Sequence, residues 1–320
     1  MIPWLVLLQT TLTIATGPAS GPESWPLWVA QSEGYFTQEK LAVNLAPARA
    51  DTVAAEALAH HRVDLAATSL DAAITLGHVG GTPPKLVFGL TATPAAVLVV
   101  PASQKETIRT VSDLGGKTVG ISAPGTAAAL SLLSLLDAAG VAVPKVTVKS
   151  YGDRGLASAI AAGEIAAGIV DEPAATRLVD EGQAVVLADL RKKDADVKWL
   201  GVATVFSAVF AAADTKLDPA QLTALCRALL RALARLDSAT PEELRAALPP
   251  DARGFPEDFA TRLAGARETY LRDGWVSPEM LGASVALVKN RTAIPVKVSI
   301  PGVDRLLLTN PLRAAIESPR

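Results

Sequence analysis

The sequence holds few of the residues that catalytic and metal sites need. Of its 320 residues, one is cysteine and three are histidine. Cys226 falls in the apolar stripe of a predicted helix, so we interpret it as a small core residue, and a lone cysteine excludes a disulfide within the chain. His60, His61 and His78 show no metal-ligand spacing, and no phosphate loop, Rossmann fingerprint or nucleophile elbow occurs. We therefore expect no catalytic residue, no metal ion and no cofactor.

Strong charge and aromatic side chains are also scarce. The formal net charge is -2, whereas a nucleic-acid-binding surface needs a basic field, so nucleic acid is excluded as a partner. Hydrophobic residues make up 50% of the chain but aromatic residues only 4%, so the apolar mass is mainly Ala, Val and Leu. This composition is typical of buried parallel sheets covered by Ala-rich helices. No run reaches the roughly 18 uninterrupted apolar residues of a membrane-spanning helix.

The first residues are apolar but do not make a complete export signal. Ile2–Leu8 is an apolar run, and no Lys or Arg precedes Lys40. A full signal has a positive start, a longer apolar segment and a small-residue cleavage site. We interpret residues 1–9 as the remnant of an export signal, which predicts a periplasmic or cell-surface protein. The alternative is a plain first strand with an apolar lead-in.

Apolar runs of strand length alternate with helical patterns up to about residue 212. The predicted strands are residues 12–16, 42–45, 65–67, 86–90, 97–100, 118–121, 146–149, 167–170 and 184–187. From Asp218 onward only helices are predicted, each with a proline in or just before its first turn, where the missing N–H costs nothing. The pattern predicts an α/β fold with parallel sheets covered on both faces.

The chain is long enough for two lobes, because one hydrophobic core usually stops growing below this length. Residues 118–187 form a complete β–α series, and extended runs precede and follow it at 86–101 and 201–212. Two strands that cross between lobes let one lobe rotate over the other. We therefore predict lobe 1 from residues 10–93 plus 206–320 and an inserted lobe 2 from residues 94–205. The crossings are expected near 92–98 and 200–207.

Four segments keep the order and spacing of a known family. They are WVAQSEGYF from Trp28 with LAV from Leu41, VSDLGGKTVG from Val111, AAGEIAA from Ala161, and DEP from Asp171. Across about residues 11–290 the set resembles the nitrate/sulfonate/taurine-type solute-binding proteins of ABC importers, the SsuA/NMT1/THI5-like family. The resemblance implies a type II periplasmic-binding-protein fold, two α/β lobes around a ligand cleft with two hinge crossovers. It also implies a small-molecule solute and a permease subunit in the membrane as partners. We expect a monomer.

Ligands of open α/β sheets bind outside the carboxyl ends of the strands, so the loops after the predicted strands hold the candidate site. Trp25 offers a surface for stacking, or it is a hydrophobic staple beside Pro26. Thr68 and Ser69 contact the ligand, or they cap the following helix. The ligand-binding candidates are Ser20, Trp25, Thr68, Ser69, Thr91 and Thr93 in lobe 1 and Gly125, Thr126, Tyr151, Gly152, Asp171 and Glu172 in lobe 2.

The turn at Gly125 and Thr126 joins a strand to an Ala/Leu-rich helix. Free N–H groups at the positive end of a helix dipole favour an anion, so we expect the solute's acidic group here. The resemblance agrees, because the family's corresponding helix start holds that group. The alternative is an ordinary helix cap.

Asp171 and Glu172 place two carboxylates side by side, where the family usually has Trp before Glu-Pro. They suit an amine or amide of the solute, or Glu172 caps the helix that opens at Pro173. Ala166 stands where the family often has Asp, so this region is less polar than usual.

These features together favour the substrate-binding subunit of an ABC importer, not an enzyme, which captures a small polar or anionic solute such as a sulfonate, a carboxylate or a pyrimidine-like compound. One alternative is a biosynthetic enzyme on the same fold, of the thiamine-pyrimidine or menaquinone-pathway type. The eukaryotic pyrimidine synthases that resemble this family carry a Cys-rich motif, which a chain with one cysteine lacks. A LysR-type sensory domain is the other alternative, and it needs a helix-turn-helix before the first strand.

Overall fold

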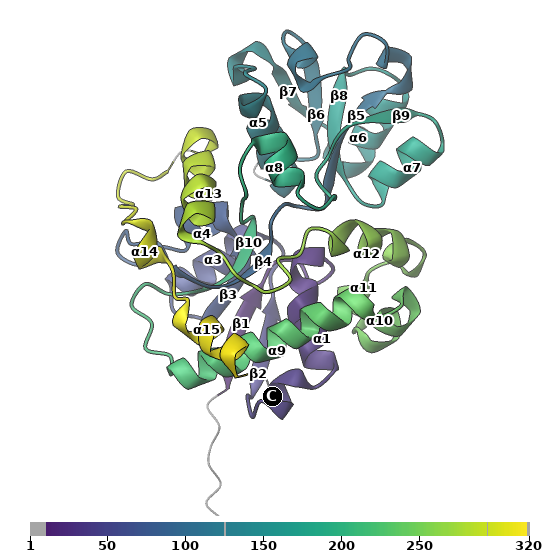
Figure 1. Ribbon diagram of the computed structural model, residues 1–320. Coiled ribbons are helices and arrows are strands. Elements are labelled where there is room, and N and C mark those ends of the chain that lie inside the picture. Colours follow the sequence, from purple (N-terminus) through teal and green to yellow (C-terminus); the bar gives the residue numbers. More distant parts are fainter. Residues whose placement is uncertain (1–10, 125, 293, 319–320) are drawn as a thin grey trace, which may run out of the picture.

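The computed structural model describes residues 11–124, 126–292 and 294–318. The predicted export-signal remnant at residues 1–9 lies outside them. The chain folds into two lobes, one stacked above the other in Figure 1. Each lobe is built on its own five-stranded sheet. Within the described residues, no helix is both long and apolar enough to cross a membrane.

The lobe 1 sheet has the strand order β2-β1-β3-β10-β4. Its strands β1, β2 and β3 are parallel, and Ile14 pairs with Leu45 on one side and Leu65 on the other. The strand β10 runs antiparallel to both of its neighbours, β3 and β4. The bounds are β1 Leu12–Thr16, β2 Val43–Pro47, β3 Leu65–Ser69, β4 Lys85–Thr91 and β10 Ser207–Ala211.

The lobe 2 sheet repeats this plan with the order β7-β6-β8-β5-β9. Here β5 is the strand that runs antiparallel to its neighbours, β8 and β9. In each sheet the antiparallel strand is therefore the first one after the chain has crossed from the other lobe, which modifies the parallel sheet that the sequence predicted. The bounds are β5 Ala96–Pro101, β6 Thr118–Ile121, β7 Thr147–Ser150, β8 Ala167–Asp171 and β9 Ala184–Asp189.

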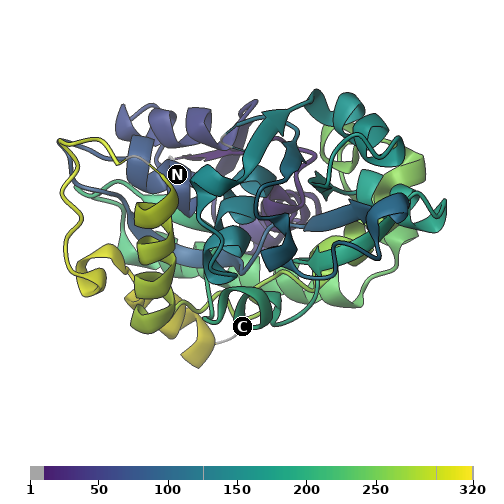
Figure 2. The ribbon, with the colours of Figure 1, turned by 90° about the horizontal axis from the view of Figure 1, so that it is seen from above.

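Helices cover both sheets. Those of lobe 2 are α5 Ala127–Ala138, α6 Gly152–Ala161, α7 Ala174–Asp180 and α8 Ala195–Leu200. Those of lobe 1 are α1 Trp25–Ser32, α2 Tyr35–Gln38, α3 Asp51–Ala59, α4 Leu70–Leu76, α9 Pro219–Ser238, α10 Pro241–Ala247, α11 Pro250–Arg253, α12 Phe259–Arg267, α13 Pro278–Arg291, α14 Val303–Leu306 and α15 Asn310–Glu317. Viewed from above in Figure 2, the teal lobe 2 lies over the middle of lobe 1.

Burial follows from this layering. Every residue of β3 and β5 is buried, as expected for strands with helices on both faces. The long helix α9 packs one apolar face, including Leu225 and Leu229, against lobe 1. Cys226 lies in that face with no exposed surface, and burial raises the pKa of its thiol to about 12. The interpretation of Cys226 as a core residue is confirmed.

Two segments connect the lobes. Residues 92–95 lead from β4 to β5, and residues 190–206, which include α8, lead from β9 back to β10. They are tied together by the hydroxyl of Thr204, which donates to the backbone oxygen of Ala92 at 2.9 Å. The first segment corresponds to the crossover predicted near 92–98, and the part of the second that follows α8 corresponds to the crossover predicted near 200–207. The lobe boundaries at 93/94 and 205/206 are retained as our proposal.

Candidate functional site

A cavity of about 630 Å³ lies between the lobes. From lobe 1 it is lined by the residues that follow β1 and β3 and by the start of α3. From lobe 2 it is lined by the start of α5 and by the two residues at the end of β8. The cavity therefore sits at the carboxyl ends of strands, where ligands of α/β sheets bind. Its size suits a small solute.

Half of the sequence-predicted binding residues line this cavity. They are Ser20, Thr68, Ser69, Thr126, Asp171 and Glu172. These residues lie up to 152 positions apart in the chain, from Ser20 to Glu172, and folding brings them to one place. Gly125 lies outside the described residues.

Trp25 does not line the cavity, which corrects the expectation of a stacking surface. Its side chain has no exposed surface, and its indole N–H donates to the backbone oxygen of Ala252 at 2.9 Å. The ring packs against Phe259, with 5.2 Å between the ring centroids. Trp25 is therefore a core residue that fixes α1 to the C-terminal helices.

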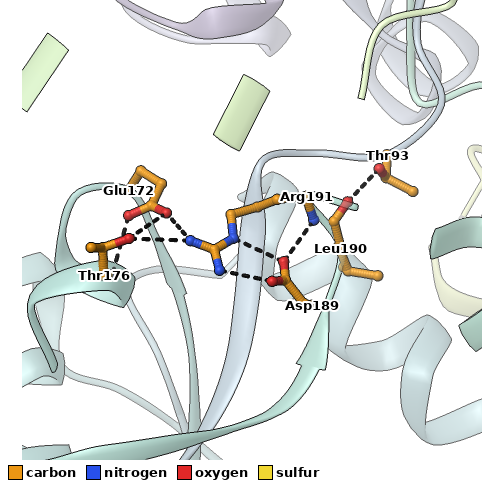
Figure 3. A network of polar contacts seen from close by, with 6 residues as sticks. All are labelled: Thr93, Glu172, Thr176, Asp189, Leu190 and Arg191. Atoms are coloured by element: carbon orange, nitrogen blue, oxygen red, sulfur yellow. Dashed lines mark hydrogen bonds and ion pairs between the residues drawn. The ribbon is translucent and has the colours of Figure 1, made fainter. Parts of the chain in front are cut away.

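Thr91 and Thr93 belong to the hinge and not to the lining. The Thr91 hydroxyl lies 2.7 Å from that of Ser207, where β4 ends and β10 begins. The Thr93 hydroxyl donates to the backbone oxygen of Leu190 at 2.6 Å and so joins the two crossing segments (Figure 3). Both are almost fully buried.

Tyr151 and Gly152 also lie away from the lining. Tyr151 packs against an apolar cluster in lobe 2. Gly152 has a φ of 68°, and its N–H donates to the backbone oxygen of Ser122 at 2.9 Å. Gly152 thus serves the turn into α6, because this backbone conformation favours glycine.

Two of the lining hydroxyls, those of Ser69 and Thr126, cap helices as the alternative interpretations held, whereas Thr68 does not cap α4 and donates its hydroxyl to the backbone oxygen of Asp51. Ser69 accepts from the N–H of Ala72 and caps α4. Thr126 accepts from the N–H of Ala129, at 3.3 Å, and caps α5. Its hydroxyl donates to the backbone oxygen of Ala123 at 3.0 Å. The cavity wall therefore includes the starts of α4 and α5, and each of these helices has a side-chain cap.

Glu172 is held in a network within lobe 2 (Figure 3). Its carboxylate, 3% exposed, forms an ion pair with Arg191. It also accepts from the backbone N–H and the hydroxyl of Thr176, at 3.2 and 2.9 Å, and so caps α7. Arg191 donates in turn to both oxygens of Asp189. Glu172 therefore caps α7, which is the alternative role that the sequence analysis gave it.

The same network shifts the acid–base properties of its members. The hydrogen bonds that Arg191 donates to Asp189 raise the pKa of Arg191 above its usual value; the charge of Glu172 adds to this effect and burial opposes it. Burial alone would raise the pKa of Asp189, but the hydrogen bonds and charge of Arg191 outweigh it and lower that pKa. Both partners therefore stay charged over the physiological pH range.

Asp51 is the site residue of lobe 1 that the sequence analysis missed. Its carboxylate sits directly over Gly17, where a Cβ atom would collide with it. The backbone oxygen of Asp51 accepts from the Thr68 hydroxyl at 2.9 Å. The loop after β2, where Asp51 opens α3, also follows the carboxyl-end rule, so that rule could have found it.

The electrostatic surroundings of Asp51 are unfavourable for a charge. Burial and the nearby carboxylates Glu23 and Asp71 raise the pKa of Asp51 to about 7, although hydrogen bonds from Ser69 lower it. Burial raises the pKa of Glu23 as well, against the lowering effect of its own N–H and of Arg262. Glu23, Asp71 and Arg262 also line the cavity. No local sequence signal identifies Arg262, which lies on α12.

Comparison with known proteins agrees with this architecture. The family described as NMT1/THI5 like matches residues 21–243. No curated protein matches the sequence significantly. Many solved structures are similar to this chain.

A protein from Bordetella bronchiseptica RB50 is 20% identical with a TM-score of 0.74, and the match covers 96% of this chain and 97% of that chain. The alkanesulfonate-binding protein SsuA from Xanthomonas axonopodis pv. citri, bound to MOPS, is 20% identical with a TM-score of 0.65, covering 93% and 98%. The periplasmic nitrate-binding protein NrtA from Synechocystis PCC 6803 is 15% identical with a TM-score of 0.62, covering 96% and 88%.

These likenesses confirm the predicted type II periplasmic-binding-protein fold. Since the family match extends over more than half of the sequence, from lobe 1 through all of lobe 2 and into α10, the chain belongs to the NMT1/THI5-like family.

Proposed function

We propose that the protein is the solute-binding subunit of an ABC importer, which captures a small polar solute between its lobes and delivers it to a membrane permease. The observation that carries this proposal is the cavity of about 630 Å³ that lies between two lobes connected by two segments of the chain. Such an arrangement can close by rotation at the hinge. We also propose that the protein is exported to the periplasm or cell surface and acts as a monomer.

The composition of the cavity supports binding over covalent catalysis. Its described lining contains serine, threonine, aspartate, glutamate and arginine side chains but neither cysteine nor histidine. Cys226, the one cysteine of the chain, is buried in lobe 1, and burial raises the pKa of its thiol. A buried neutral thiol is inert.

A thermal-shift screen of small sulfonates, carboxylates, amino acids, amines and pyrimidines tests the proposal. A solute at 100 times its dissociation constant adds about 2.7 kcal/mol of stability. We expect at least one solute to raise the melting midpoint and to reduce the radius of gyration in solution scattering as the lobes close. Mass spectrometry of the mixture should recover the solute unchanged. A converted product would overturn the proposal in favour of an enzyme.

A further inference from the structure

The cavity has an excess of negative charge on its walls. Five carboxylates line it, those of Glu23, Asp51, Asp71, Asp171 and Glu172, against the two guanidinium groups of Arg49 and Arg262. Glu172 is ion-paired with Arg191, which it shares with Asp189, and its oxygens also accept from Thr176, so it is left out of the count of carboxylates open to a ligand. Three of the remaining carboxylates, Glu23, Asp51 and Asp71, lie together on the lobe 1 side.

Asp51 stands at the centre of this group. The charged residues of the described chain that act on the pKa of Asp51 are Glu23 and Asp71, and both are acidic. The groups that stabilise its charge are the N–H and hydroxyl of Ser69. Among the residues that the structure describes, no ion pair involves Asp51, and its carboxylate borders a space large enough for a cationic group.

The two arginines do not supply that partner. Arg262 donates to the backbone oxygens of Ser20 and Arg253, and its guanidinium lies over the Trp25 ring at 5.3 Å from the centroid. Its charge acts on Glu23 and not on Asp51. Arg49 is exposed at the edge of the cavity.

Lobe 2 faces this acidic group with the start of α5, where an anion was expected. The Thr126 hydroxyl there is engaged with Ala123 and Ala129. A purely anionic solute in the cavity would gain from that helix start but would face Asp51 and its acidic neighbours at the opposite wall. The acidic wall of lobe 1 therefore favours solutes with a positive charge over solutes that carry only negative charge.

Resting on the proposed function, we propose that the solute carries a positively charged nitrogen, an amine or an amidinium, held against Asp51 and Glu23. An acidic group at the far end of the same solute is compatible with the start of α5. A cation beside Asp51 would also keep that carboxylate ionised, because an opposite charge counteracts the effect of burial on its pKa.

Solutes that differ in one group provide the first test. Taurine and isethionate share a two-carbon sulfonate but end in an ammonium and a hydroxyl, respectively; agmatine and pentylamine extend the cationic set, and pentanoate and ethanesulfonate the anionic set. We expect binding, measured by calorimetry, to be confined to members with a positive nitrogen. Binding confined to the anionic set would overturn this inference while leaving the receptor function intact. If neither these compounds nor the wider screen yields a ligand, both proposals fail.

The variant Asp51→Asn provides the second test, on whichever cationic compound binds. We expect its affinity to fall at least tenfold. Asp137→Asn is the matched control, because Asp137 is exposed at the far end of α5 and outside the lining. The control should bind like the parent. Equal affinities for the parent and Asp51→Asn, with both proteins folded by circular dichroism, would place the cation elsewhere and overturn the inference.

Discussion

Arg177 of α7 and Asp258, just before α12, form an ion pair across the two lobes, with 2.6 Å between Nη2 and Oδ1. A second interlobe contact lies beside it, where α12 presents Gly265 to lobe 2. A Cβ atom at Gly265 would lie 3.2 Å from the Cδ of Arg191 and 3.3 Å from the Cγ of Glu172. The lobes thus meet along α12, on the same side as the carboxylate network of lobe 2.

Removing the ion pair by Arg177→Ala should favour separation of the lobes. Arg177 is 60% exposed and Asp258 14%, and exposed pairs contribute about 0.2–1 kcal/mol. We expect solute affinity to fall by about two- to fivefold, with a larger radius of gyration in solution scattering without solute. Titration calorimetry and scattering measure the two effects.

The control is Arg109→Ala, which breaks the pair between Arg109 and Glu106, also 2.6 Å long but within lobe 2. That variant should keep both the affinity and the radius of gyration of the parent. Equal effects of the two variants would show that Arg177 contributes nothing specific to the meeting of the lobes.

Much of the fold follows from local pattern. The strands predicted from apolar runs, such as 12–16 and 118–121, coincide with β1 and β6, because burial on both faces demands continuous apolar residues. The antiparallel direction of β5 and β10 has no local signal, since it depends on which lobe the chain has just left.

The candidate site is less predictable than the fold. Residues after strands, such as Ser69 and Asp171, can be found because the carboxyl-end rule is positional. Trp25 could not be assigned from sequence, since its surroundings are Ala252 and Phe259, more than 200 residues away. The position of Arg262 against Ser20, 242 residues apart, is likewise a product of tertiary packing.

Replacing Trp25 with Phe tests its role in the core. The variant keeps an aromatic ring beside Phe259 but leaves the backbone oxygen of Ala252 without its indole donor. We expect the free energy of unfolding to fall by about 1–3 kcal/mol, as when a buried acceptor loses its donor, with solute affinity unchanged. Urea denaturation and calorimetry measure these. An affinity loss without a stability loss would restore the stacking interpretation.

Replacing Thr126 with Ala tests whether the start of α5 serves the cavity as well as the helix. Loss of the cap should lower stability by about 1 kcal/mol. Ser277→Ala removes an equivalent cap from α13, where Ser277 accepts from Met280 at 3.1 Å, outside the lining. We expect both variants to lose stability, but only Thr126→Ala to lose affinity, by about fivefold for each kcal/mol. Equal solute affinities of Thr126→Ala and the parent would show that Thr126 serves only as the cap of α5.

The pH dependence of stability should report on Asp51. The folded-state pKa of about 7 lies above the ordinary value of 3.8, so the folded protein holds a proton that the unfolded chain has released between these values. The stability that this proton provides is complete below about pH 4 and is lost as the pH rises to 7. Without solute, the melting midpoint of the parent should therefore fall across this range relative to that of Asp51→Asn, by about 2–4 °C per kcal/mol.

A cationic solute should reverse this trend, since it binds the ionised carboxylate. Its affinity for the parent should rise between pH 5 and 7.5 and level off above the pKa of Asp51, whereas the affinity of Asp51→Asn should change much less. Burial also raises the pKa of Glu23. We therefore expect the affinity of Asp51→Asn to keep a small dependence on pH. Calorimetry of both proteins at matched ionic strength measures the two curves. Parallel curves would mean that the proton released on binding comes from a group other than Asp51.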